Sequence, residues 1–175
     1  IVIALSVLAL GALTNLFLIF NSIYGYQQIS MATAGSSAAA MNAFEAAVLP
    51  AEEVLASHDF SGTTYSSEAT TLVLQLPAVD SSGNIIPNAK DYVAFYTSST
   101  NLYRLVQASA GSMRVSGRTQ LSTTLSSLSF TYDDSDFTNV TNIIADIQTQ
   151  AQFKEETVQS NLHEQLYLRN KQPLL

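Results

Sequence analysis

Two histidines, His58 and His163, are the side chains of this sequence best suited to accept a proton near neutral pH. A serine activated by one of them would be the simplest hydrolytic site. Neither histidine, however, lies near a Gly-x-Ser-x-Gly turn or a comparable nucleophile motif. The chain has no cysteine, which excludes thiol catalysis, disulfides and cysteine-based zinc sites. We therefore expect no catalytic residue, no cofactor and no enzymatic activity.

The densest group of possible metal ligands is formed by Asp133, Asp134 and Asp136. Carboxylate oxygens are the ligands that Ca²⁺ prefers, which makes these residues weak calcium candidates. Their spacing does not match an EF-hand loop, and a solvated hairpin tip is the simpler prediction. Asn139 begins an Asn-Val-Thr sequon, which is glycosylated only in a host that has the enzymes for it.

The charge balance argues against nucleic acid as the main ligand. The 175 residues include 7 Lys and Arg against 14 Asp and Glu, so the net charge is 7 − 14 = −7. Phosphate binding requires clustered basic side chains, which an acidic chain with a pI near 4.5 does not favour. Only 12% of the residues are charged and 47% are hydrophobic, so much of the chain is expected to contact something other than water.

The elements that must position these residues begin with an uncharged segment, because the first charged residue is Glu45. Residues 1–20 are almost purely apolar, and about 20 residues at a helical rise of ~1.5 Å each would cross a bilayer core of ~30 Å. A signal peptide would need a basic start and a shorter apolar run. A buried core helix of this length would rarely lack a charge. The segment therefore predicts a membrane-spanning helix.

Helix signals continue past the apolar segment to about residue 57, with no proline before Pro50. Pro50 either kinks this helix or opens the first turn of a new one. Glycine weakens a helix interior by about 1 kcal/mol, so we expect local loosening over residues 11–15 where the surroundings permit it. Helical spacing places one apolar stripe toward a sheet. The residues expected to pack on that sheet are Met41, Phe44, Val48 and Leu55.

From residue 58 onward, alternating apolar residues and turn-forming clusters predict antiparallel strands. The predicted strands are 71–76, 92–96, 102–107, 125–132, 142–150 and 158–169. The predicted fold is α+β, with a long N-terminal helix over residues 1–57 and a globular antiparallel sheet domain over residues 58–175. Within the helix, residues 1–20 form a transmembrane or filament-core segment, and residues 21–57 pack on the sheet.

A helix that is apolar over its first half must be covered by lipid or by copies of itself. Small residues such as Gly11 let such helices approach closely. A non-closing contact between identical subunits generates a filament, in which Arg104, Arg114, Arg118 and Arg169 are available for ion pairs with neighbouring subunits. The residues expected at the subunit interface are Ile1, Val2, Ile3, Leu5, Val7, Leu8, Leu10, Gly11, Leu13, Leu16, Phe17, Leu18, Phe20 and Ile23.

The chain resembles a bacterial type IV pilin or type II secretion pseudopilin. The apolar start carries part of the resemblance, and the ending carries the rest: the segment 125–132, then the Ile143 and Ile147 strand, then Leu-Arg-Asn-Lys at 168–171. Members of this family begin with Phe or Met and carry a glutamate a few residues in. Both features are missing here, so we expect that a short N-terminal stretch is absent from this sequence.

The resemblance implies a structural subunit that is first held in the inner membrane as a single-pass precursor and is then extracted by an assembly machinery. It implies an extracellular filament of identical subunits, of the kind used in motility, adhesion, DNA uptake and secretion. The alternative is a single-pass membrane-anchored protein with an outer β-rich binding domain that does not polymerise. A membrane-anchored hydrolase is a more remote third possibility.

Overall fold

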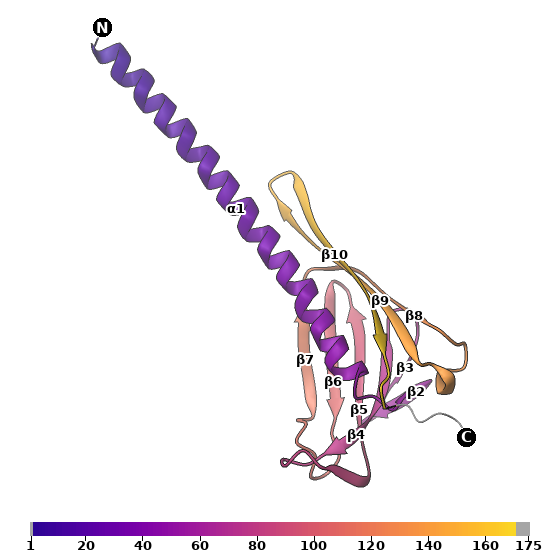
Figure 1. The fold of residues 1–175 in the computed structure, drawn as a ribbon. Coiled ribbons are helices and arrows are strands. Elements are labelled where there is room, and N and C mark those ends of the chain that lie inside the picture. Colours follow the sequence, from indigo (N-terminus) through magenta and orange to yellow (C-terminus); the bar gives the residue numbers. More distant parts are fainter. Residues whose placement is uncertain (1, 171–175) are drawn as a thin grey trace.

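The chain folds into one long helix and a β-rich body that packs against the second half of that helix (Figure 1). The computed structural model describes residues 2–170, and the side chains of residues 2, 4, 5 and 7–9 lie outside the description. Helix α1 spans Val2–Val48, which corresponds to about 70 Å at 1.5 Å per residue. We call residues 2–31 the stem and residues 32–170 the head.

The head contains three antiparallel sheets. The five-stranded sheet has the order β1-β4-β5-β6-β7, the three-stranded sheet has the order β10-β9-β8, and β2 pairs with β3 in a separate hairpin. The strands are β1 (Glu53–Val54), β2 (Ser57–Phe60), β3 (Thr63–Ser66), β4 (Leu72–Val79), β5 (Ile85–Ser98), β6 (Asn101–Gln107), β7 (Gly117–Ser122), β8 (Leu125–Tyr132), β9 (Asn142–Phe153) and β10 (Glu156–Tyr167). A short 3-10 helix, η1 (Phe137–Asn139), lies between β8 and β9.

Phe44 joins the two larger sheets to the helix. Its ring is fully buried and meets Phe95 of β5 edge-on, with 4.9 Å between ring centroids. On the other side it meets Phe130 of β8 at 5.2 Å. Met41 and Val48 belong to the same buried cluster. One face of α1 therefore forms the centre of the core, with a sheet on either side of it.

Small polar residues take over from apolar ones in the middle of the helix. Thr149 of β9 is fully buried and donates a hydrogen bond to the backbone carbonyl of Thr33 over 2.9 Å. The Ser37 and Ser160 hydroxyls lie 2.9 Å apart, and the Ser36 hydroxyl donates to Ser122 over 2.8 Å. Each short side chain lets a strand approach the helix closely while its polar atom keeps a partner. These contacts connect α1 to β7 on one side and to β9 and β10 on the other.

The helix ends at Val48, earlier than the expected end near residue 57. The proline at position 50 disfavours helical geometry in the residue before it, and the chain then extends to pair Glu53 and Val54 with β4. Leu55 consequently does not continue the helical stripe. It packs instead with Phe60 and Val73 on the opposite face of the five-stranded sheet. The prediction that Leu55 packs between helix and sheet is therefore wrong.

In the single chain, α1 is continuous through residues 11–15, and the loosening expected there in suitable surroundings stays a prediction. Thr14 donates its hydroxyl to the Leu10 carbonyl over 2.9 Å, which adds a hydrogen bond at the place where Gly11 weakens the helix. In the strand predicted at 71–76, Leu72, Leu74 and Leu76 face the core around α1, and Val73 is buried on the opposite face of the sheet. The sequence does not predict β2, β3 and β7, because their short, mostly polar sequences lack alternating apolar residues, and β1 lies in the range predicted as helix.

Replacing Phe44 by alanine should destabilise the head by about 3–5 kcal/mol, because the truncation leaves a cavity between two sheets that cannot close around it. Urea unfolding of the full chain in detergent, followed by tyrosine fluorescence, measures the change. Phe17→Ala is the matched control, since Phe17 is 67% exposed on the stem. Equal effects of the two substitutions would contradict the central position of Phe44.

Candidate subunit interface

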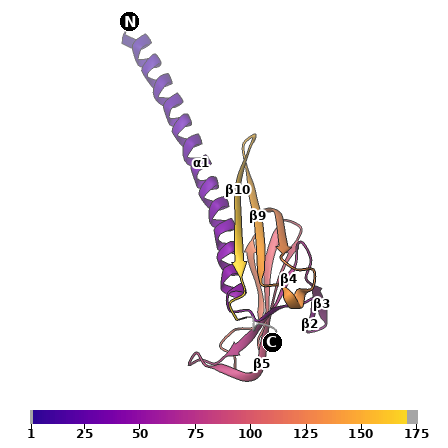
Figure 2. The same ribbon diagram turned by 45° about the vertical axis from the view of Figure 1, so that its right-hand side comes forward.

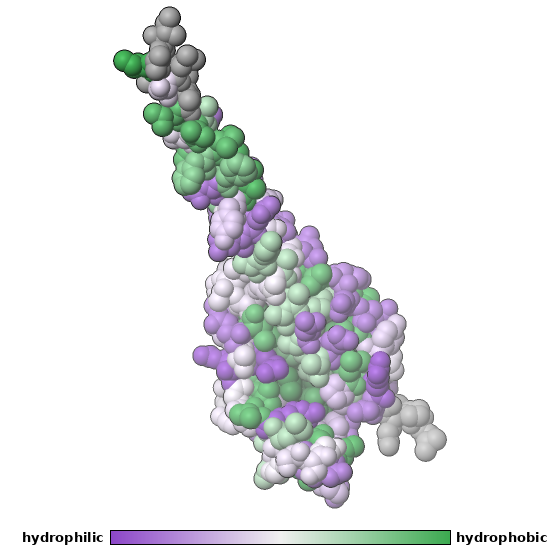
Figure 3. Space-filling model, turned by 60° about the vertical axis from the view of Figure 1, so that its left-hand side comes forward, coloured by the Kyte–Doolittle hydropathy of each residue, from purple (hydrophilic) through white to green (hydrophobic). Residues whose placement is uncertain are grey.

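The stem extends away from the head with large apolar side chains uncovered (Figure 1). Leu13 is 63% exposed, Phe17 67% and Phe20 62%. Figure 3 shows apolar surface over this part of the helix, in contrast to the mixed polar surface of the head. Side chains this large are normally buried in a stable assembly, so the stem is the most conspicuous unsatisfied surface of the described molecule.

The exposed apolar side chains point in every direction around the stem. The consecutive residues 16–20 are all more than half exposed, so no polar face exists there. A helix that is apolar all round is normally enclosed on all sides. Among the residues that the structure describes, no helix is both long enough and apolar enough to span a membrane.

The described members of the expected interface set all lie on this surface. Exposed side chains are found at Ile3, Leu10, Leu13, Leu16, Phe17, Leu18, Phe20 and Ile23, and Gly11 has no neighbouring atom within 4 Å of the position a Cβ would take. Ile1 lies outside the described residues. The side chains of Val2, Leu5, Val7 and Leu8 also lie outside them.

The head reaches the stem through the tip of the β9–β10 hairpin, residues 153–156, which we call the hairpin tip (Figure 2). The ring of Phe153 packs edge-on against Tyr26, with 6.1 Å between centroids. A Cβ on Gly25 would lie 2.8 Å from that ring, so glycine permits the contact. Lys154 Nζ donates to the Ser22 hydroxyl over 2.7 Å. A groove of about 670 Å³ lies between the tip and the stem.

The hairpin tip was not found from the sequence, because the strand predicted at 142–150 ended too early. The signal that would have found it is the Lys-Glu-Glu run at 154–156 between two alternating strands. Lys154 adopts a positive φ of 54° at the turn. The tip places charged residues directly beside the apolar stem.

The closing segment of the chain seals the end of α1. The backbone N–H of Arg169 donates to the Leu49 carbonyl over 3.3 Å, and the Asn170 side chain donates to the Pro50 carbonyl over 3.2 Å. Leu168 is buried in the same core as Phe44. Carbonyl groups at a helix C-terminus need such donors. The described part of the Leu-Arg-Asn-Lys motif thus holds the C-terminal end of α1 in place.

The two histidines lie on different sheets and in different surroundings. His58 stacks on Tyr92 with ring centroids 3.6 Å apart, and its Nε2 lies 3.0 Å from Gln107 Oε1. His163 is exposed on β10, where its Nδ1 lies 2.5 Å from Asp146 Oδ1. Neither hydrogen bond involves a serine or threonine hydroxyl. Among the described contacts, nothing assembles a histidine-activated nucleophile.

The three calcium candidates hydrogen-bond to their own loop. Asp133 accepts from the Thr141 backbone over 3.0 Å, and Asp134 accepts from the Asp136 backbone over 2.8 Å. Asp136 accepts from the Thr138 backbone over 3.0 Å and so caps η1, which Asn139 ends. Within residues 2–170, no three acidic or histidine side chains are grouped so that they could hold a metal ion.

Tyrosines gather on the outer face of the five-stranded sheet. Tyr96 stacks on Tyr103 at 5.5 Å and contacts Tyr65 at 4.5 Å, while Arg118 lies over the Tyr103 ring at 4.9 Å. Burial and the hydrogen bond with Tyr96 raise the pKa of Tyr65 to about 12. The rings contact one another in a half-buried row, as expected of cross-strand pairs.

Comparison with known proteins gives no match: no family model, no curated protein and no solved structure is similar to this chain.

The pH dependence of an Asp133 substitution tests whether this carboxylate stabilises its own loop through hydrogen bonds. Partial burial raises the pKa of Asp133, but hydrogen bonds from Thr141 and Asn142 outweigh it and hold this pKa below its usual value. The carboxylate therefore adds stability that is fully present above its unfolded pKa of about 3.9 and is lost as the pH falls through the lower folded pKa.

Asp133→Ala should accordingly lower the free energy of unfolding by about 1 kcal/mol at neutral pH. The difference should shrink at about pH 2.5. Chemical denaturation at the two pH values measures it, with Glu155→Ala, at the exposed hairpin tip, as the control. A difference that stays constant with pH, or that appears only when Ca²⁺ is added, would contradict the loop assignment.

Proposed function

We propose that this protein is the structural subunit of a type IV pilus-like extracellular filament, which polymerises through its apolar stem. The observation that carries the proposal is the stem itself, a continuous helix whose large apolar side chains are exposed on all sides while its other end is fixed in a folded head. The protein then acts as a building element, without catalysis, cofactor or nucleic acid.

Burial of apolar surface supplies the free energy of assembly. Each Å² removed from water contributes about 25 cal/mol, whether the cover is lipid or protein. A stem can therefore exchange lipid for the stems of other copies at little cost in free energy. Since the contact surrounds the helix, it joins different faces of successive copies and continues as a helical filament.

The resemblance to pilins supports the same proposal, because it also includes the features of the head. A stem-first α+β subunit with an antiparallel head and a closing Leu-Arg-Asn-Lys motif is the arrangement that the resemblance implied. In the proposed sequence of events, residues 1–20 hold a single-pass precursor in the inner membrane, and an assembly machinery then extracts it. The membrane stage rests on the sequence of residues 1–20 alone.

Expression of the full chain together with a pilus assembly machinery tests this function. Negative-stain microscopy of the sheared surface fraction should reveal thin fibres that contain the protein. Phe17→Ala should lower the temperature at which these fibres dissociate, because it removes apolar contact from the stem interface. Met113→Ala is the matched control, since Met113 is 60% exposed on the head.

Detergent-soluble monomers without fibres would instead support the single-pass anchor with a non-polymerising outer domain. Equal heat stability of Phe17→Ala and unsubstituted fibres would show that the stem is not the polymerising surface.

A further inference from the structure

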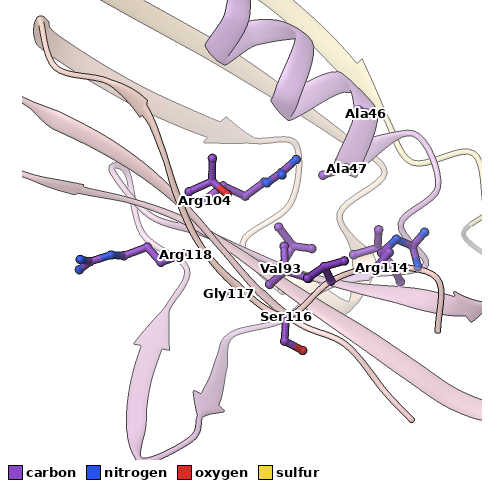
Figure 4. Close-up of a pocket in the computed structure, with 12 residues that line it drawn as sticks. Ala46, Ala47, Val93, Arg104, Arg114, Ser116, Gly117 and Arg118 are labelled. Atoms are coloured by element: carbon purple, nitrogen blue, oxygen red, sulfur yellow. The ribbon is translucent and has the colours of Figure 1, made fainter. Parts of the chain in front are cut away.

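A pocket in the head holds a positive charge that the protein does not neutralise. The pocket has a volume of about 500 Å³ and lies between the C-terminal end of α1, at Ala46 and Ala47, and strands β4 to β7 (Figure 4). We call it the arginine pocket. Arg104 lines it from β6, in the row of residues that faces the helix together with Leu102 and Val106.

Arg104 is half-buried, and its Nε atom is fully buried without a hydrogen-bond acceptor. No carboxylate of a described residue forms an ion pair with it. An arginine that has lost part of its hydration without gaining a partner is costly in free energy. The Arg104 guanidinium can therefore bind a carboxylate, because a planar guanidinium forms two parallel hydrogen bonds with the two carboxylate oxygens.

The other arginines near the pocket are already engaged. Arg114 pairs with the fully buried Asp91 over 2.6 Å and also donates to the Pro77 carbonyl over 2.6 Å. Arg118 points away from Arg104 and lies over the Tyr103 ring on the opposite face of the sheet (Figure 4). The uncompensated charge in the pocket therefore belongs to Arg104.

The matching carboxylates lie at the opposite end of the head. Glu155 and Glu156 are exposed at the hairpin tip beside the stem, and no hydrogen bond or ion pair within residues 2–170 occupies either side-chain carboxylate. The arginine pocket is lined by the end of α1. Figures 1 and 2 show that this end of the helix lies away from the stem. Within one copy the two sites are thus far along the head from each other, so they can meet only between copies.

We propose that the hairpin tip of one copy inserts Glu155 or Glu156 into the arginine pocket of the next copy along the filament. The inference rests on the proposed function and deepens it by naming the contact between heads. A tip at one end and a pocket at the other make a head-to-tail contact, which continues indefinitely when stems lie side by side. Charge pairing of this kind sets the register of subunits that the apolar stem alone would leave free to slide.

Charge reversal tests the contact. Arg104→Glu and, separately, the double variant Glu155→Arg with Glu156→Arg should each abolish fibres or reduce their number at least tenfold, and the combination of all three changes should restore them. Arg118→Glu is the matched control, because it makes the same charge change on the neighbouring strand but on the other face. The tip variant alters only exposed side chains, so its result does not depend on the folding of the pocket.

The absence of cysteine allows a second test by cross-linking. Val115, 84% exposed at the rim of the pocket, and Thr157, exposed next to the tip, are changed together to cysteine. Oxidised fibres should give a ladder of dimers, trimers and longer products on a non-reducing gel. The pair Val115→Cys with Gln165→Cys, at the other end of β10, should give none.

The outcomes separate the two proposals. Fibres that form without a cross-link ladder and tolerate both charge reversals would overturn this contact and leave the proposed function standing. A failure of the unsubstituted chain to form fibres at all would overturn both.

Discussion

One continuous helix lies in two environments, the core of the head and the surroundings of the stem. The arrangement of the rest of the molecule follows from that constraint. One face of its second half lies in a core between two sheets, while large apolar side chains of its first half, such as Leu13 and Phe17, are exposed. The stem cannot fold back onto the head without breaking backbone hydrogen bonds of the helix. The apolar stem therefore stays outside the head, with its large side chains exposed in the monomer.

The head is organised to hold this rod firmly. Phe44 connects both sheets through edge-on aromatic contacts, serine and threonine side chains hold the middle of the helix, and the chain end donates hydrogen bonds to the carbonyls after Val48. The hairpin tip adds a contact further along, where Phe153 reaches Gly25.

Much of this architecture was predictable from hydrophobic periodicity. The helix start, the stripe at Met41, Phe44 and Val48, and the alternation in β4 and β8 follow directly from apolar spacing. Periodicity failed where contacts are polar or non-local. The strand β7 has few apolar residues, and Leu55 keeps helical spacing although the chain has already become extended. Arg104 looks like any surface arginine in the sequence, because only the tertiary fold buries its Nε without a partner.

The most direct test of the account is a cryo-electron microscopy reconstruction of the assembled native protein. In an assembled filament, the stems should bundle along the axis, with Leu13, Phe17 and Phe20 of each copy buried against the stems of other copies. Density in which each stem is surrounded by lipid or detergent alone, with no second stem in contact, would contradict it.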